Sequence, residues 1–447
     1  MASTYLTRTF GSATSRTKFT VSLWLKKTFI GAENHFFNGY NSANYRFMIY
    51  FDSSDRLKIR NVDNGSETTE YVSNAKYRDV HGWYHVVVRI DTSQAGGNRI
   101  KAYVNGEQIT SWATSTEPNQ GSDFSLGASS YSNILGSYAG TNHFWDGGIS
   151  HYHYCDGQSY GPTEFGQTNA TTGEWSIKAS PSVTYGNQGF FMFDDDSSLT
   201  DKSGNGNNFT VGAGTLTKTE DNPSNVFATF NSLSGAETMA VNSTFANGNN
   251  KVTCGGTVYA PFGSTIGVNS GKYYAEFKIK SAAADGMIGI FAKNGTSNSQ
   301  YLGNLAYQYC WYNDSGRIIG NNANIQTGVG QYTTNDIIGI ALDCTNNKLY
   351  FHKNGTYITN GSGTGNPSSG TYGYSITDPA STDLGFYFMA AMDWGGSTRA
   401  IWEANFGNGY FGTTAVSSAG TNASGNGIFE YDVPTGYTAL STKGLNL

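Results

Sequence analysis

Alternation of apolar and polar side chains marks β-strands along most of this chain. Over residues 84–91 (YHVVVRID) the side chains divide into two faces with the two-residue period of a strand. After a glycine-containing loop, strand character resumes over 99–104. Asn105-Gly106 then predicts a tight hairpin turn, because a type I′ turn needs positive φ at both central residues. The pattern predicts strand, loop, strand, turn and return strand.

The same alternation recurs on both sides of this stretch. A hairpin is predicted around the polar turn 52–55, and the segment 336–358 repeats the design of 84–109 with its own Asn354-Gly355 turn. Further predicted strands cover 19–26 (FTVSLWLK), 45–51 (YRFMIYF), 56–60, 144–154 (FWDGGISHYHY) and 272–280 (KYYAEFKIK).

Composition agrees with an all-β protein. Charged residues make up only 13% of the 447 residues, whereas aromatic residues reach 14% and glycine occurs 57 times, as suits pleated surfaces and many turns. No long segment shows sustained apolar i, i+3, i+4 spacing, so we expect little helix. The length exceeds one ordinary core, which predicts two domains.

Charge and cysteine usage narrow the function classes. The net charge of −6 and the scattered Lys and Arg residues give no basic field for nucleic acid. No apolar run approaches the roughly 18 residues of a membrane span, so no membrane insertion is expected. The N-terminus lacks the apolar core of a secretory signal, which predicts folding in a cytoplasm. The four cysteines are widely spaced, so we expect buried free thiols.

Two resemblances give the expected domains a family. The series FTVSLWLK, YRFMIYF, WYHVVVRID, IKAYVNGEQI and FWDGGISHYHY resembles the laminin-G-type, or concanavalin A-like, jelly roll over residues 1–160. The motifs GKYYAEFKI, DIIGIALD, KLYFHKNG, ANFGNGYF and PTGYTAL resemble the SPRY domain over residues 231–447. The resemblances imply two concanavalin A-like β-sandwiches. The SPRY family works as a binding module, so the second sandwich is expected to bind a partner or ligand.

The segment 161–230 is expected to be an ordered, turn-rich connector. Its strings PTEFGQTNATTGEWSIKA, YGNQGFFMF and DDDSSLTDKSGNGNNFT resemble a linker that follows laminin-G-like domains in structural proteins of tailed bacteriophages, especially marine ones. The resemblance implies a virion protein made in the host cytoplasm. The aromatic residues of the segment argue against a floppy linker, since burying each would contribute ~1.5–3 kcal/mol: Trp175, Phe190, Phe191 and Phe193.

Catalytic and metal motifs find little support, and we expect no enzyme activity. The E-x-D-x-x-E motif of laminarinase-type enzymes is absent, and its nearest echo, Glu430-x-Asp432, lacks the second glutamate. His151, His153 and Cys155 would share a strand face, but about 7 Å separates neighbours of this spacing, too far for one zinc ion on a straight strand. Three acidic residues offer hard oxygen ligands for a calcium ion, although a solvated turn is the favoured explanation: Asp194, Asp196 and Asp201.

Aromatic residues in or near Gly/Ser/Asn-rich segments are the remaining candidates for a site. Sugar-binding clefts use such rings as apolar platforms, although core packing is the favoured explanation for any single ring. The candidate carbohydrate-binding residues are Trp112, Tyr138, Trp145, Trp311, Tyr312 and Trp394.

The sequence thus leads to three hypotheses of function. The first is a virion surface protein, such as a tail fibre, spike or head fibre, that binds polysaccharide on the host cell surface. Such a protein would contact other virion proteins and form a homo-oligomer, with a trimer favoured by analogy with phage fibres, so that avidity offsets weak single sites. The second is a purely architectural decoration or adaptor protein. The third is a polysaccharide depolymerase.

Overall fold

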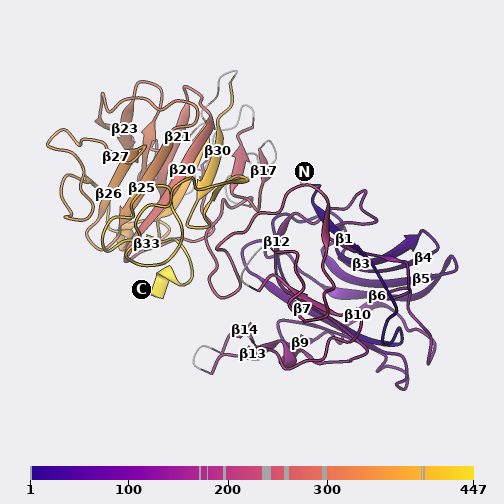
Figure 1. The fold of residues 1–447 in the computed structure, drawn as a ribbon. Coiled ribbons are helices and arrows are strands. Elements are labelled where there is room, and N and C mark those ends of the chain that lie inside the picture. The colour runs from indigo at the N-terminus through magenta and orange to yellow at the C-terminus, as the bar shows by residue number, and fades with distance from the viewer. Residues whose placement is uncertain are drawn as a thin grey trace. The chain divides into compact units, whose positions relative to one another are not determined.

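The chain forms two compact all-β units. The computed structural model describes residues 3–170, 173–178, 180–194, 198–233, 243–255, 261–293, 300–393, 395 and 398–446. The first unit comprises Met1–Lys218 and Asn222–Ser224, and the second comprises Thr219–Asp221 and Asn225–Leu447 (Figure 1). Helix among the described residues is limited to short 3₁₀ turns: η1 (Pro162–Glu164), η2 (Pro379–Ser381) and η3 (Gly444–Asn446). None of the helices found in this part of the chain is long and apolar enough to cross a membrane.

Two antiparallel sheets make up the first unit, with a short hairpin beside them. The eight-stranded sheet has the order β10 (Trp112–Thr116), β6 (Ser66–Lys76), β5 (Arg56–Asp63), β4 (Tyr45–Phe51), β3 (Asn34–Ser42), β11 (Ser132–Leu135), β1 (Tyr5–Thr9) and β16 (Thr210–Ala213). The six-stranded sheet has the order β15 (Phe190–Met192), β12 (Gly147–Asp156), β2 (Lys18–Lys27), β7 (Tyr84–Asp91), β8 (Ile100–Val104) and β9 (Glu107–Gln108). The hairpin pairs β13 (Gly166–Thr168) with β14 (Trp175–Ile177).

The first core lies between these sheets, where the alternation predicts it. From β2 and β7 the core receives the side chains Phe19, Val21, Leu23, Leu25, Val86, Val88 and Ile90. Asn105 and Gly106 have φ angles of 50° and 85°, as the predicted hairpin turn between β8 and β9 requires. The predicted hairpin of β4 and β5 and the strand over 84–91 are likewise confirmed.

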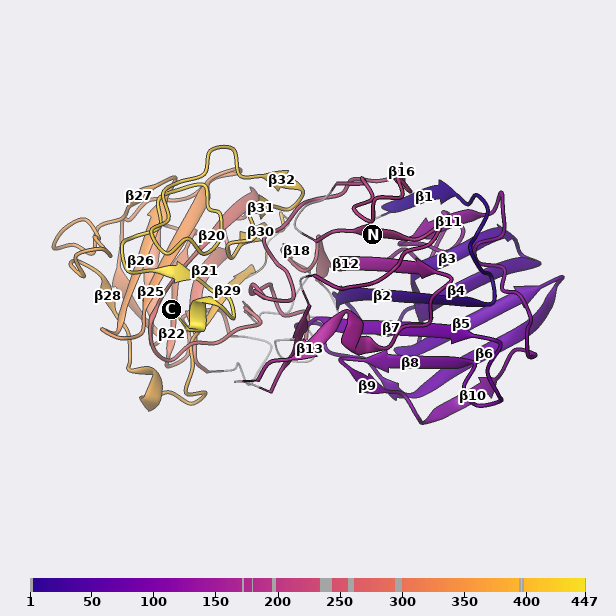
Figure 2. The same ribbon diagram turned by 60° about the horizontal axis from the view of Figure 1, so that its bottom comes forward.

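Much of the segment predicted as a connector packs on the first sandwich. The Trp175 indole stacks on the His85 imidazole, and its Nε1 donates a hydrogen bond of 2.8 Å to His85 Nδ1. Phe190 is fully buried in the first core. Further along, β16 pairs with β1 at the edge of the eight-stranded sheet (Figure 2). The described parts of this segment therefore pack against the first sandwich through Trp175, Phe190 and β16.

The second unit is also built from two large sheets. The nine-stranded sheet has the order β17 (Thr244–Ala246), β18 (Lys251–Thr253), β30 (Ile401–Asn405), β20 (Lys272–Ser281), β25 (Ile337–Asp343), β26 (Lys348–Lys353) and β27 (Thr356–Tyr357), with β28 (Tyr374–Ser375) on β26 and β33 (Thr438–Ala439) on β20. The six-stranded sheet has the order β19 (Phe262–Gly263), β29 (Phe388–Asp393), β21 (Gly286–Phe291), β22 (Gln308–Tyr312), β23 (Arg317–Gly320) and β24 (Ala323–Gln326). A separate hairpin joins β31 (Tyr410–Phe411) and β32 (Thr414–Ala415).

The second core confirms the predicted faces and the repeated hairpin. β20 buries one face of alternate side chains in the core, namely Tyr273, Ala275, Phe277 and Ile279. Asn354 and Gly355 turn the chain between β26 and β27 with φ angles of 49° and 81°. All four cysteines are buried and free, which confirms the expectation of unpaired thiols.

A polar network lies on the outer face of β20, beneath the C-terminal segment. Glu276 accepts hydrogen bonds of 2.8 Å from the backbone amides of Glu430 and Tyr431 and one of 2.9 Å from the Tyr274 hydroxyl. Burial raises the pKa of Glu276 to about 7. The imidazole of His352 lies 2.6 Å from the same hydroxyl, in space that a side chain at Gly339 would fill. The network anchors the C-terminal segment to the sheet.

Candidate functional site

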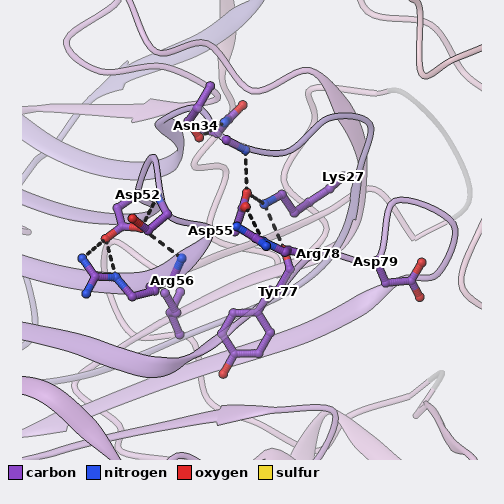
Figure 3. Close-up of polar contacts among 12 residues, drawn as sticks. Lys27, Asn34, Asp52, Asp55, Arg56, Tyr77, Arg78 and Asp79 are labelled. Carbon is purple, nitrogen blue, oxygen red and sulfur yellow. Dashed lines mark hydrogen bonds and ion pairs between the residues drawn. The ribbon is translucent and has the colours of Figure 1, made fainter. Parts of the chain in front are cut away.

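Loops at one end of the first sandwich are anchored by a buried ion pair. Asp55, fully buried after β4, accepts a hydrogen bond of 3.0 Å from Lys27 Nζ at the end of β2 (Figure 3). It also accepts from the Gly31 amide at 2.9 Å and from Arg78 Nε at 3.0 Å. Lys27 Nζ in turn donates to the Tyr77 carbonyl at 3.1 Å. The carboxylate therefore joins the loops at 28–33, 52–55 and 77–82.

The environment of this pair lowers the pKa of both groups. Burial alone would raise the pKa of Asp55, but the hydrogen bonds from Gly31 and Lys27 hold it below its ordinary value. Burial lowers the pKa of Lys27, which its bond to Asp55 opposes. The ammonium group also lies 4.7 Å from the centre of the Phe51 ring. A charged pair with every near partner satisfied fixes loop geometry better than an apolar contact would.

The loop at 28–33 is anchored to Asp55 through the Gly31 amide, and its last residue, Glu33, contacts His35. Its carboxylate accepts a hydrogen bond of 2.8 Å from His35 Nε2, and this bond holds the pKa of Glu33 below its usual range. His35 Nδ1 faces the Asn38 side-chain oxygen at 3.0 Å, while the Asn38 amide group donates to the Ser137 carbonyl. Both ring nitrogens of His35 therefore lie within hydrogen-bond distance of a side-chain oxygen, which fixes the orientation of the ring.

Two tyrosines and a second histidine surround this pair on the outer face of the eight-stranded sheet. The Tyr138 ring lies 5.3 Å from His35 and 5.7 Å from Tyr40, each in an edge-on arrangement. His143 Nε2 lies 3.8 Å from the Glu33 carboxylate. The side chains of Glu33 and His143 are 34% and 41% exposed, and both tyrosines are half-buried, so a ligand in solvent can reach them. We call Glu33, Tyr40, Tyr138 and His143 the outer-face patch.

One sequence-predicted aromatic residue of the first domain falls in this patch, and two lie elsewhere. Tyr138 is part of it. Trp145 is only 6% exposed and packs in the core against Phe36, 5.8 Å away, so a sugar ring cannot stack on it. Trp112 is half-buried on the edge strand β10, edge-on to Tyr71 at 5.0 Å. Trp145 is therefore a core residue, contrary to the expectation of an exposed platform.

The two described candidates of the second domain, Trp311 and Tyr312, are buried and offer no exposed platform. Trp311 is fully buried, and its Nε1 donates to the Gly330 carbonyl at 3.0 Å. Tyr312 is 5% exposed and donates to Asp285 Oδ1 at 2.8 Å. Trp394 lies outside the described residues. Alternation within the core strand β22 places Trp311 inside, and the nearby polar residues form the turn that follows.

The acidic residues considered for calcium are engaged in local contacts. Asp201 is buried and accepts hydrogen bonds from Phe191 N, Ser203 N, Ser203 Oγ and Asn207 N at 2.8–2.9 Å. Asp194 pairs with Lys202, and Asp196 lies outside the described residues. Four donors occupy the Asp201 carboxylate, which thereby organises the turn that it opens. Among the described residues, no group of three or more His, Cys, Asp and Glu side chains could hold a metal ion.

The remaining chemical motifs also have structural partners. A β-bulge separates His151, at a φ of 46°, from His153, which stacks on Phe191 at 4.1 Å and lies 2.9 Å from the Tyr185 hydroxyl. Glu430 accepts hydrogen bonds from Ser417, and Asp432 accepts from Thr421. These last two carboxylates hold turns of the C-terminal segment.

Comparison with known families assigns both domains. A model of the concanavalin A-like lectin/glucanases superfamily matches residues 2–158, and a model of the SPRY domain matches residues 272–365. The chain is therefore an all-β protein with two β-sandwich domains, a concanavalin A-like domain followed by a SPRY domain. No curated protein matches the chain in sequence.

Solved structures of similar fold are distant. The SPRY domain of human HERC1 is 16% identical, with 36% of this chain and 91% of that chain covered and a TM-score of 0.27. The TRIM65 PSpry domain is 12% identical, with 40% and 91% covered and a TM-score of 0.28. The heptameric SAP-like pentraxin from Limulus polyphemus is 16% identical, with 35% and 71% covered and a TM-score of 0.27. These likenesses are too remote to transfer a ligand to this chain.

The sequence did not predict three residues of the outer-face patch, namely Glu33, Tyr40 and His143. Tyr40 lies on a strand whose bulges interrupt the alternation. Glu33 and His143 lie in loops far apart in the chain, and only the fold brings them together. One sequence signal could have pointed to this surface. In residues 45–51, Arg46, Met48 and Tyr50 alternate with the core positions, so this strand has an outer face, and the strand paired with it has one too.

Proposed function

We propose that this protein binds glycans through the outer-face patch of its concanavalin A-like domain. The observation that carries the proposal is the contact of two half-buried tyrosines, Tyr40 and Tyr138, with a solvent-accessible carboxylate and imidazole beside them. Sugar sites combine such rings with a few polar groups, since the rings cover the apolar faces of a sugar and the polar groups bind its hydroxyls. The lowered pKa of Glu33 favours the ionised carboxylate, which accepts hydroxyl hydrogen bonds.

The proposed biological setting is the surface of a tailed-bacteriophage virion, in a fibre, spike or similar appendage. The resemblance of residues 161–230 to phage linkers supports this setting. One shallow site gives weak binding, and a Kd near 1 mM corresponds to about 4 kcal/mol. Display on a homo-oligomer, with a trimer favoured, would raise avidity by about 10²–10⁴. Host-surface polysaccharide and other virion proteins are the proposed partners.

A glycan array with matched variants tests the proposal. The full chain should bind a subset of bacterial surface glycans, and Tyr138→Ala and Tyr40→Ala should each weaken that binding at least tenfold. Tyr372→Ala is the control, because Tyr372 is 48% exposed on the second domain and lies in no proposed site. Thermal unfolding checks that each variant folds. Binding that folded patch variants retain in full would refute the site, and no binding to any host glycan would refute the function.

A further inference from the structure

The outer face of the eight-stranded sheet carries one more group beside the patch, the guanidinium of Arg46. Arg46 of β4 lies directly opposite Tyr40 of β3 in the antiparallel register. Directly opposed residues share a face, with Cβ atoms about 4.5–5.5 Å apart. Because the Tyr40 ring contacts Tyr138, the three side chains form a continuous row from the β11–β12 loop to β4.

Arg46 differs from its cationic neighbours on this face in having no acidic partner. Lys58 forms an ion pair with Glu70, and Arg60 forms one with Glu67. Among the described residues, no carboxylate pairs with Arg46, and its buried Nε has no hydrogen-bond partner. Since the side chain as a whole is only half-buried, its charge is available to a ligand.

The carboxylate nearest the tyrosines does not compensate this charge. Glu33 is already bonded to His35 and lies near His143. Glu70 and Glu67 are paired with Lys58 and Arg60, and Asp52 is paired with Arg56. An uncompensated guanidinium is therefore the distinctive electrostatic feature of this surface, although the whole chain carries a net charge of −6.

We infer that the outer-face patch recognises an anionic sugar, whose oxyanion binds the Arg46 guanidinium while the sugar ring contacts Tyr40 and Tyr138. This inference rests on the proposed glycan-binding function and specifies its ligand class. Arginine suits the task because its planar fork donates paired hydrogen bonds to a carboxylate or phosphate. A uronic acid and a phosphorylated sugar present the same chemistry, and the experiment separates them.

The test measures binding of the full chain to an oligouronate and to its carboxyl-reduced form, which keeps the backbone and loses the charge. The oligouronate should bind about tenfold or more tightly than the reduced form, as one charge-assisted contact allows. Arg46→Gln should abolish this preference, and Arg46→Lys should retain part of it. Arg60→Gln is the matched control, since Arg60 lies on the same face in an ion pair.

Competition separates the two sources of an oxyanion. Displacement of the bound oligosaccharide by glucuronate but not glucose identifies a carboxylate, and displacement by glucose 6-phosphate alone identifies a phosphate; either supports the inference. Equal binding of the charged and reduced oligosaccharides would overturn the inference and leave the glycan-binding function intact. Preference that survives in folded Arg46→Gln, or falls equally in Arg60→Gln, would also overturn it. Absence of any glycan binding would refute the function itself.

Discussion

Replacement of Lys27 by methionine tests how the first sandwich holds its loops. Methionine keeps most of the apolar stem of lysine, so the change removes the ammonium group and little packing. The lost interactions are the 3.0 Å bond to Asp55, the 3.1 Å bond to the Tyr77 carbonyl and the contact with the Phe51 ring. Asp55 would remain fully buried with only the Gly31 amide and Arg78 as partners.

The structure sets the expected cost of this change. Removing one partner of a buried ion pair costs about 3–5 kcal/mol, because the other charge stays buried. The Arg78 side chain, 55% exposed, compensates Asp55 in part, so we expect about 3 kcal/mol. For a unit of this size, 1 kcal/mol lowers Tm by about 2–4 °C, which gives a loss of about 6–12 °C.

Denaturant unfolding followed by tryptophan fluorescence measures this cost, with calorimetry to resolve the two domains. Lys58→Met is the matched control, since Lys58 and Glu70 form a partly exposed pair whose loss should cost below about 1 kcal/mol. Asp55→Asn in the Lys27→Met background should recover part of the stability, because it removes the buried charge. Equal losses for Lys27→Met and Lys58→Met, or a double variant less stable than the sum of its parts, would refute the reasoning.

Three further predictions concern the cover of the first sandwich and the network of the second. Trp175→Ala should destabilise the first domain by about 1–3 kcal/mol and speed hydrogen exchange in residues 161–178, because it uncovers His85; unchanged exchange would show that the indole does not hold this segment. Gly339→Ala should unfold or strongly destabilise the second domain in thermal melts, since its Cβ would lie 1.9 Å from His352 Nε2, and a wild-type Tm would contradict the packing. Glu276 has a folded pKa of about 7 and an unfolded pKa near its ordinary 4.5, so the folded state binds more protons between these values, and stability should fall as pH rises from about 5 to 7. A folded Glu276→Gln variant should lose this pH dependence of Tm in thermal melts between about pH 5 and 7. An unchanged pH dependence would show that another group causes it.

The strands were predictable because burial of one face leaves a direct trace in the sequence. A strand that buries alternate residues, such as β7 or β20, repeats apolar positions with a period of two, and Asn-Gly at its hairpin fixes the turn. Which segments of the chain pack over the outer faces of the sheets was harder to predict. His85 and Glu276 are polar positions in the alternation, yet both are buried by segments distant in the chain.

The candidate site could be predicted only in part, for the same physical reason. A tryptophan in a Gly/Asn-rich segment fits the core and a sugar platform equally well, and Trp145 and Trp311 prove to be core residues. Tyr138 was found, but its partners were not. A loop ion pair such as Lys27–Asp55 and a contact such as Glu33–His143 depend on which loops meet at one end of the sandwich, and no local spacing encodes that meeting.

The most direct test of the central claim is a crystal structure of the full chain with the tightest-binding host oligosaccharide. We predict a sugar ring in contact with Tyr40 and Tyr138, with hydroxyl groups on Glu33 or His143 and an oxyanion on Arg46. An oligosaccharide bound at another surface of the protein, with the outer-face patch unchanged, would contradict the account.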